Sequence, residues 1–181
     1  MSTTAIDVPA RAASPIEGDL TLHDLPDRDL DEHELRSLAS YLAGRPDLWQ
    51  HHLAFDDDNR VYVSLHRDTH VDVWLLCWTP ENDTGFHDHD ISSGAVAVVS
   101  GTLVEHNLAV GDETIETFVE GGRVFSFGPD HIHRLTCAES GSVSVHAYSP
   151  PLWRMGQYAV GADGRLRRQS VSYADELCPI D

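Results

Sequence analysis

Two histidines separated by one residue, His87 and His89, stand in the stretch GFHDHDISSGAVAVVSG, just before a run of small and β-branched residues. In an extended chain, side chains two positions apart project to the same face, so both imidazoles can reach one metal ion. The alternative is a pair of solvated loop histidines among aspartates. A third ligand is expected from another strand, and the stretch FGPDHIHRL offers His131 and His133. We favour His133, which begins an apolar strand, and expect His131 at the rim of the site or in solvent.

A second set of polar residues alternates in the stretch SVSVHAYSPPL, which contains Ser144, His146 and Tyr148. Because the side-chain period of a strand is two, these residues are expected on one face, where they can form a relay from hydroxyl to imidazole to phenol. The competing interpretation is an amphipathic strand whose polar residues face solvent. The pattern predicts that Ser144, His146 and Tyr148 act together as one hydrogen-bonded group.

The elements that must position these residues are mainly short strands. Alternating or short apolar runs, separated by Gly, Asp, Asn and Pro, occupy residues 60–65, 71–80, 94–110, 113–122, 123–129, 133–139, 142–150 and 155–173. About eight short strands with frequent turns predict a mainly β fold, a jelly-roll barrel or sandwich. One amphipathic helix is predicted from its N-cap Asp31 to its terminal Gly44, and a second short helix from Pro46 to His52.

The length and charge of the chain limit its organisation and its partners. With 181 residues, one domain is expected over residues 29–181. It is preceded by an arm over residues 1–28, rich in Ala, Ser, Thr and Pro, that is either disordered or draped over the body. Twelve Lys and Arg against 30 Asp and Glu give a net charge of −18, which argues against a nucleic-acid partner.

The remaining composition predicts a cytoplasmic protein with no membrane partner. No apolar stretch approaches the roughly 20 residues that span a bilayer. The three cysteines are widely spaced, and the N-terminus lacks the pattern of a secretory signal. The sequence leaves the oligomeric state open, with a monomer as the simplest case.

The motifs together resemble the cupin superfamily. An H-x-H opens a strand, Gly101 follows about a dozen residues later, and a Gly-Pro turn precedes the third histidine. The Ser-x-His-x-Tyr strand followed by SPP, and the LLCW strand before the metal motif, are similar to the thiol dioxygenase branch of the cupins, typified by cysteine dioxygenase. The resemblance covers roughly residues 62–151.

This resemblance implies a cupin-type jelly roll and a non-haem Fe(II) enzyme that adds both atoms of O₂ to a small cysteine-like thiol, giving a sulfinate. It also implies a catalytic role for Tyr148, oriented by His146 and in turn by Ser144, and a cis Ser149–Pro150 peptide. The usual cupin glutamate ligand has no counterpart, because Asp90 lies too close to His89 and on the opposite pleat. Three neutral imidazoles also describe zinc sites, so ligand type alone does not fix the metal.

Gly94 marks one departure from the mammalian members of the family. They carry a cysteine at this position, cross-linked to the tyrosine that corresponds to Tyr148. Glycine, as in bacterial members, excludes such a thioether.

The substrate site departs from the family pattern more seriously. The family's carboxylate-binding arginine lies two residues after a tyrosine that is matched by Tyr62, where this chain has Ser64. We therefore predict Tyr62, Ser64 and Arg60 as substrate-binding positions, with Arg60 or Arg67 as the arginines that could replace the missing one. If neither enters the pocket, free cysteine should be a poor substrate, Ser64→Arg should improve its use, and the substrate could be a mercapto acid, a cysteamine-like amine or a specialised thiol.

Two other functions stay open on this sequence. One is a cupin metalloenzyme of different chemistry, an isomerase or another oxygenase, that uses the same three histidines. The other is a non-catalytic cupin that binds a metal or a ligand.

Overall fold

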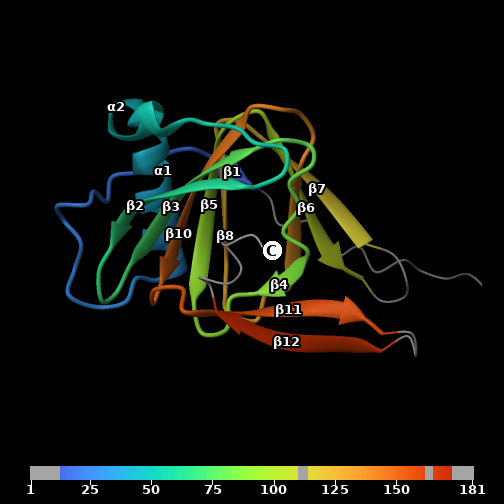
Figure 1. Cartoon of the computed structure of the whole chain (residues 1–181). Helices are drawn as coiled ribbons and strands as arrows, with labels where there is room; N and C mark the ends of the chain where they lie inside the picture. Colours follow the sequence, from blue (N-terminus) through green and yellow to red (C-terminus); the bar gives the residue numbers. More distant parts are fainter. Residues whose placement is uncertain (1–12, 110–113, 162–164, 173–181) are drawn as a thin grey trace, which may run out of the picture.

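The computed structural model describes residues 13–109, 114–161 and 165–172, which form two face-to-face sheets (Figure 1). Within these residues, sheet A has the strand order β1 (Ser14–Pro15), β8 (Arg123–Phe127), β5 (Ser93–Ser100), β10 (Ser142–Ser149), β3 (Asp72–Trp78), β2 (Val61–Arg67). Sheet B has the order β12 (Leu166–Ser172), β11 (Arg154–Val160), β4 (Phe86–Asp88), β9 (His133–Cys137), β6 (Thr102–Leu108), β7 (Thr114–Glu120). The predicted mainly β, two-sheet architecture is confirmed.

Helix α1 (Glu32–Ala43) covers the outer face of sheet A, against β5 and β10. It begins with the predicted capping box: the Asp31 carboxylate accepts a hydrogen bond from the Glu34 amide at 2.9 Å, and the Glu34 carboxylate accepts one from the Asp31 amide at 3.0 Å. Its buried apolar stripe consists of Leu35, Leu38, Ala39 and Leu42. Helix α2 (Pro46–Trp49) and the 3₁₀ helix η1 (Gln50–His52) follow, so both predicted helices are confirmed.

Strand β10 is buried on both faces because sheet A lies between α1 and sheet B. Its apolar residues Val143, Val145 and Ala147 join the core beneath the helix. The alternate residues project between the sheets, where His146 and Tyr148 line a cavity. The alternation predicted for this strand therefore places its polar residues in the interior and not in solvent.

The predicted strand 94–110 is wrong as a single element. It is two strands, β5 and β6, which belong to different sheets and meet at Gly101. Gly101 has φ +73°, and a Cβ there would lie 2.1 Å from the Ser142 Oγ, so only glycine fits this turn.

The H-x-H pair also lies differently from the expectation that it enters the following strand. His87 lies in the separate short strand β4, and His89 follows its end. Asp90, with φ +56°, then turns the chain toward β5 in the other sheet. The turn at Asp90 therefore separates the H-x-H pair from the apolar strand that follows it in the sequence.

The described part of the predicted N-terminal arm, residues 13–28, lies against the domain, and residues 1–12 lie outside the described residues. Strand β1 pairs with β8, and the amides of Asp19 and Leu20 both donate to the Ser37 Oγ of α1 at 3.0 Å. The Ser149–Pro150 peptide is cis, as predicted. Among the described residues, no helix is both long enough and apolar enough to cross a bilayer.

Candidate functional site

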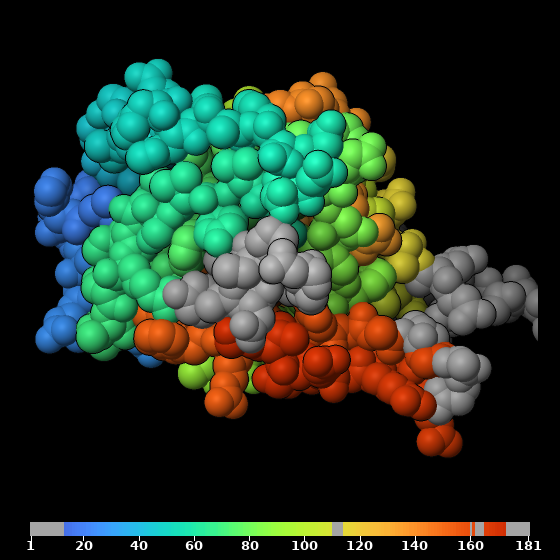
Figure 2. Space-filling view, viewed as in Figure 1, coloured from blue at the N-terminus to red at the C-terminus, as the bar shows by residue number. Residues whose placement is uncertain are grey.

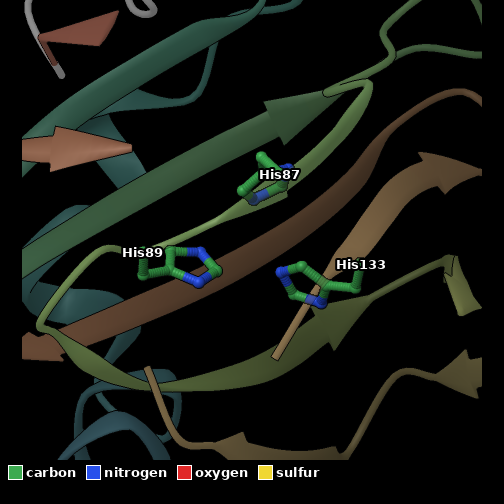
Figure 3. A group of neighbouring side chains, drawn as sticks. All are labelled: His87, His89 and His133. Carbon is green, nitrogen blue, oxygen red and sulfur yellow. The ribbon is translucent and has the colours of Figure 1, made fainter. Parts of the chain in front are cut away.

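The three predicted metal ligands converge between strands β4 and β9. His87 of β4 is the direct cross-strand partner of His133 of β9, and His89 lies two residues beyond His87. Their ring centroids are 4.8 Å (His87–His89), 4.8 Å (His87–His133) and 5.1 Å (His89–His133) apart. One nitrogen from each ring lies within 4.8 Å of the others, and the rings face a common space (Figure 3).

Burial favours the neutral form of His87 and His89. His87, His89 and His133 are 3, 1 and 1% exposed. Burial, followed by the proximity of the other histidines, lowers the pKa of His87 and of His89 well below the ordinary value. Neutral imidazoles are the form that binds a metal.

Hydrogen bonds orient two of the three rings. The Nδ1 of His87 lies 3.0 Å from the Gly85 carbonyl oxygen, and the Nδ1 of His133 lies 2.9 Å from the Glu105 Oε1. Both oxygens are acceptors, so each Nδ1 carries the proton and each Nε2 keeps its lone pair for a metal.

The His89 ring indicates whether the cluster suits a metal ion. Both its nitrogens are buried, and neither has a hydrogen-bond partner among the described residues. Buried polar atoms without partners cost free energy, which a bound metal would offset. The three histidines therefore fit a mononuclear metal centre with positions left for ligands.

Glu105 of β6 is a site residue that the sequence reasoning missed. It is 1% exposed, and its Oε1 accepts hydrogen bonds from His133 at 2.9 Å and from His131 at 2.8 Å. Burial alone would raise its pKa, but these two hydrogen bonds lower the pKa of Glu105 to about 2, so it is ionised. The signal was available: in TLVEHNL, Glu105 alternates with the apolar Leu103 and so shares its inward face.

His131 lies at the edge of this cluster. Its side chain is 22% exposed and its ring stacks on Phe127 at 5.6 Å. Together with Glu105 and His133 it could also bring ligand atoms within 4.8 Å of one another. However, the 2.8 and 2.9 Å contacts of Glu105 are hydrogen bonds that satisfy these atoms. The His87–His89–His133 group is thus the better metal site.

The polar residues of β10 form the expected chain of contacts, which begins at an unpredicted residue. The Trp78 Nε1 donates to the Ser144 Oγ at 2.8 Å. The Ser144 Oγ lies 2.8 Å from the His146 Nε2, and the His146 Nδ1 lies 3.2 Å from the Tyr148 Oη. The indole can only donate, so Ser144 accepts from it, and the Ser144 O–H is left free to donate to the His146 Nε2.

The direction of these hydrogen bonds determines whether the Tyr148 hydroxyl accepts from His146 or donates to it. Burial, with smaller effects of His133 and Arg60, lowers the pKa of His146 to about 3, so its ring is neutral and carries one proton. When Ser144 donates to the Nε2, that proton is on the Nδ1. That N–H donates to the Tyr148 Oη. Burial raises the pKa of Tyr148, which keeps the phenol protonated. The Tyr148 O–H is then available to donate to another group.

A small cavity of about 50 Å³ adjoins the histidine cluster through His87. It is lined by Arg60, Trp74, Leu76, Trp78, Thr84, His87, Leu135, His146, Tyr148, Leu152 and Met155. Among these described residues only Arg60 carries a permanent charge. Its guanidinium carbon lies 5.7 Å from the centre of the Trp78 ring, and its Nη1 donates to the Asp83 carbonyl oxygen at 3.4 Å. The cavity is thus apolar with one cationic end.

The other predicted substrate-binding positions lie elsewhere. Ser64 is exposed and is not among the residues that line the cavity. Its side chain is short, and it lies on β2, an edge strand of sheet A. Tyr62 packs edge-on against Trp74, with ring centroids 5.6 Å apart. Arg67 donates to the buried Asp72 at 2.8 Å and covers the Trp153 ring, so it is committed outside the cavity.

Gly94 lies beside Tyr148 in the register of β5 and β10. A Cβ at Gly94 would lie 2.4 Å from the Phe127 ring and 3.1 Å from the Tyr148 ring. The packing therefore leaves no room for a side chain where the resembling mammalian enzymes carry their cross-linking cysteine.

Comparison with known proteins gives one family and several distant structures. A family model described as cysteine dioxygenase type I matches residues 1–160. A protein with a double-stranded β-helix domain from Klebsiella pneumoniae is 13% identical, with 66% of this chain and 91% of that chain covered at a TM-score of 0.48. An RmlC-like cupin protein from Desulfovibrio desulfuricans is 18% identical, with 55% and 90% covered at a TM-score of 0.46. No curated protein matches significantly.

Proposed function

The chain belongs to the cysteine dioxygenase type I family, and on that basis we propose that it is a non-haem Fe(II) dioxygenase of a small thiol. The observation that carries this proposal is the buried three-histidine cluster, which opens through His87 onto a cavity with Arg60 and Tyr148 in its wall. His87, His89 and His133 would hold the iron. When bound, the ferrous ion supplies the redox chemistry by which both atoms of O₂ are added to a thiolate sulfur, giving a sulfinate.

Arg60 binds the substrate at the end of the cavity. A guanidinium forms paired, charge-assisted hydrogen bonds with a carboxylate, and Arg60 is the only permanent cation among the described lining residues. It therefore takes the role for which Ser64 is unsuited. This selects thiols that carry a carboxylate, such as cysteine or a mercapto acid, over an amine such as cysteamine.

Tyr148 acts on the reacting end of the substrate. Its phenol keeps its proton, accepts the N–H of His146, and so can donate its own O–H to the thiolate sulfur. The donor is held in place by the Trp78–Ser144–His146 chain before substrate arrives, which is the condition for electrostatic preorganisation. The apolar residues Leu76, Leu152 and Met155 exclude water from the same space.

The proposal is tested by measuring iron content, O₂ consumption and sulfinate formation with cysteine, 3-mercaptopropionate and cysteamine. We expect one sulfinate per O₂, with the carboxylate-bearing thiols saturating at the lower concentrations. Arg60→Ala should raise the KM of those thiols by roughly ten- to hundredfold, since such a clamp is worth about 1.5 to 3 kcal/mol and each 1.4 kcal/mol is tenfold. The KM for cysteamine should barely change.

Arg60→Lys is the matched control, because it keeps the charge and loses the paired geometry. It should recover only part of the affinity. Absence of sulfinate with every thiol tested, in protein that holds iron, would refute the proposed reaction. An Arg60→Ala variant that affects cysteamine as much as cysteine would refute the role of Arg60 alone.

A further inference from the structure

Asp88, the last residue of β4, stands between the proposed metal ligands His87 and His89, and its carboxylate contacts residues of β11 and β12. It is 6% exposed. Its carboxylate accepts hydrogen bonds from the Arg168 Nε at 2.7 Å and Nη2 at 2.8 Å, and from the Tyr158 hydroxyl at 2.6 Å. It also accepts from the amides of Gly156 at 3.1 Å and Asp90 at 2.9 Å. These contacts fill the acceptor capacity of a carboxylate.

The same arginine holds both chain neighbours of His89. Besides Asp88, the Arg168 Nη2 donates to the Asp90 Oδ1 at 3.2 Å. The hydrogen bond from the Asp90 amide to the Asp88 carboxylate closes an Asx turn around His89. Asp90 has φ +56°, a conformation that costs free energy for a residue other than glycine. The ion pair therefore fixes a turn that the backbone alone does not favour.

His89 needs this support more than the other two ligands. The rings of His87 and His133 are oriented by hydrogen bonds to Gly85 and Glu105, whereas neither ring nitrogen of His89 has such a partner among the described residues. Its ring is held by stacking on Phe127 and Tyr148, with centroids 4.6 and 5.3 Å away. Strand β4 has three residues and pairs with β9 only at His87.

Gly156 makes the ion pair possible. It is the β11 residue that pairs with Asp88 on one side and with Ser170 on the other. A Cβ at Gly156 would lie 2.2 Å from the Arg168 Nε and 2.5 Å from the Asp88 Oδ2. Arg168 thus crosses β11 over the one position that has no side chain. The hairpin of β11 and β12 runs along the lower edge of the molecule, in orange and red (Figure 2).

We propose that Arg168 is a positioning residue for the metal centre, which it supports by clamping Asp88 and Asp90 and so fixing the backbone that carries His89. This rests on the proposed three-histidine metal site. The β11–β12 hairpin then supports the metal site, although none of the three proposed ligands lies on it.

The experiment measures the affinity of the metal-free protein for Co²⁺, whose visible absorption reports the number and arrangement of its ligands. Arg168→Gln, Asp88→Asn and Gly156→Ala should each weaken binding by about 10- to 100-fold, the usual effect of removing support from a metal ligand, and should alter the spectrum. Arg168→Lys should recover part of the affinity. The matched control is Arg167→Gln, the same change on the preceding residue, which faces the other side of β12.

The melting temperature of each metal-free variant separates local positioning from loss of fold. Should Arg168→Gln fail to fold, Asp88→Asn carries the test, since it keeps the size of the side chain and an oxygen for the Asp90 amide. Unchanged Co²⁺ affinity and spectrum in Arg168→Gln, with binding lost in His89→Ala, would overturn the clamp. Undiminished binding in both His89→Ala and His133→Ala would overturn the metal centre, and the clamp with it.

Discussion

The two walls of the site are stabilised by different forces. On the sheet A side, Ser144, His146 and Tyr148 lie on β10, an eight-residue strand in which every residue is buried between the helix core and the inter-sheet core. On the sheet B side, His87 lies on a three-residue strand and His89 lies beyond its end. The first wall is held by apolar packing on one face and by buried hydrogen bonds on the other, whereas the second has only a short strand to hold it.

Charged hydrogen bonds replace packing on the sheet B side. Glu105 holds His133, and the clamp of Asp88 and Arg168 holds the turn at His89. Hydrogen bonds to ionised groups are stronger than neutral ones, so a few of them can fix ligands that a short strand cannot. Substitutions on sheet B are therefore expected to act on metal affinity, and substitutions on sheet A on turnover and stability.

The largest expected effect is that of His133→Ala. Removing one of the three proposed imidazole ligands should abolish metal retention, measured as metal per protein after gel filtration. His131→Ala is the matched control and should keep its metal, because His131 binds Glu105 and lies at the edge of the cluster. The opposite result, with metal kept in His133→Ala and lost in His131→Ala, would mean that the Glu105–His131 group is the true site.

The sequence predicted the sheet A wall well because its signal is local. Alternation in residues 142–149 determines which side chains share a face, and burial on both sides follows from the apolar residues between them. The helix from its capping box at Asp31 was predictable for the same reason. These features depend on residues a few positions apart.

For the sheet B wall, the sequence predicted that His87, His89 and His133 lie together, but none of the contacts that support them. Glu105 and His133 are 28 positions apart, and Asp88 and Arg168 are 80 positions apart, so no local pattern pairs them. On the other sheet, the sequence offered both Arg60 and Arg67 as replacements for the missing arginine, and only the structure shows that Arg60 lines the cavity. Such side-chain contacts depend on which strands are neighbours in a sheet, so they can be predicted only when the sheet topology is known.

Glu105→Gln tests whether charge holds the sheet B ligands. The amide oxygen can still accept from His133, but a neutral hydrogen bond is roughly half as strong as a charged one. We expect the metal affinity to fall by about tenfold, at the low end for loss of support to a metal-binding histidine. Glu116→Gln is the control, since Glu116 contacts His106 on the neighbouring strand, with 3.3 Å between oxygen and nitrogen. Equal affinities in the two variants would show that the charge of Glu105 contributes nothing.

The smallest effect is expected on sheet A, from Ser144→Ala. The change leaves the Trp78 Nε1 and the His146 Nε2 without the hydroxyl between them, so the free energy of unfolding should fall by about 1–3 kcal/mol for an orphaned buried group. Metal affinity should not change, because no metal ligand contacts this serine. The proton of Tyr148 loses its fixed direction, which should lower kcat by two- to tenfold if one hydrogen bond of about 0.5–1.5 kcal/mol is lost.

Ser142→Ala is the control that distinguishes loss of the Ser144–His146–Tyr148 relay from a general loss of stability. Ser142 lies two positions earlier on the same face of β10, is equally buried, and makes two hydrogen bonds of its own, from the Thr102 amide at 3.2 Å and to the Glu139 carbonyl oxygen at 2.9 Å. Its loss should destabilise the fold by a similar amount and leave kcat unchanged, because Ser142 does not contact His146. Equal kcat in the two alanine variants, measured well below their melting temperatures, would remove the relay from the mechanism. A decrease of kcat in Ser144→Ala alone would show that the hydrogen bonds of β10 orient the Tyr148 hydroxyl in addition to stabilising the fold.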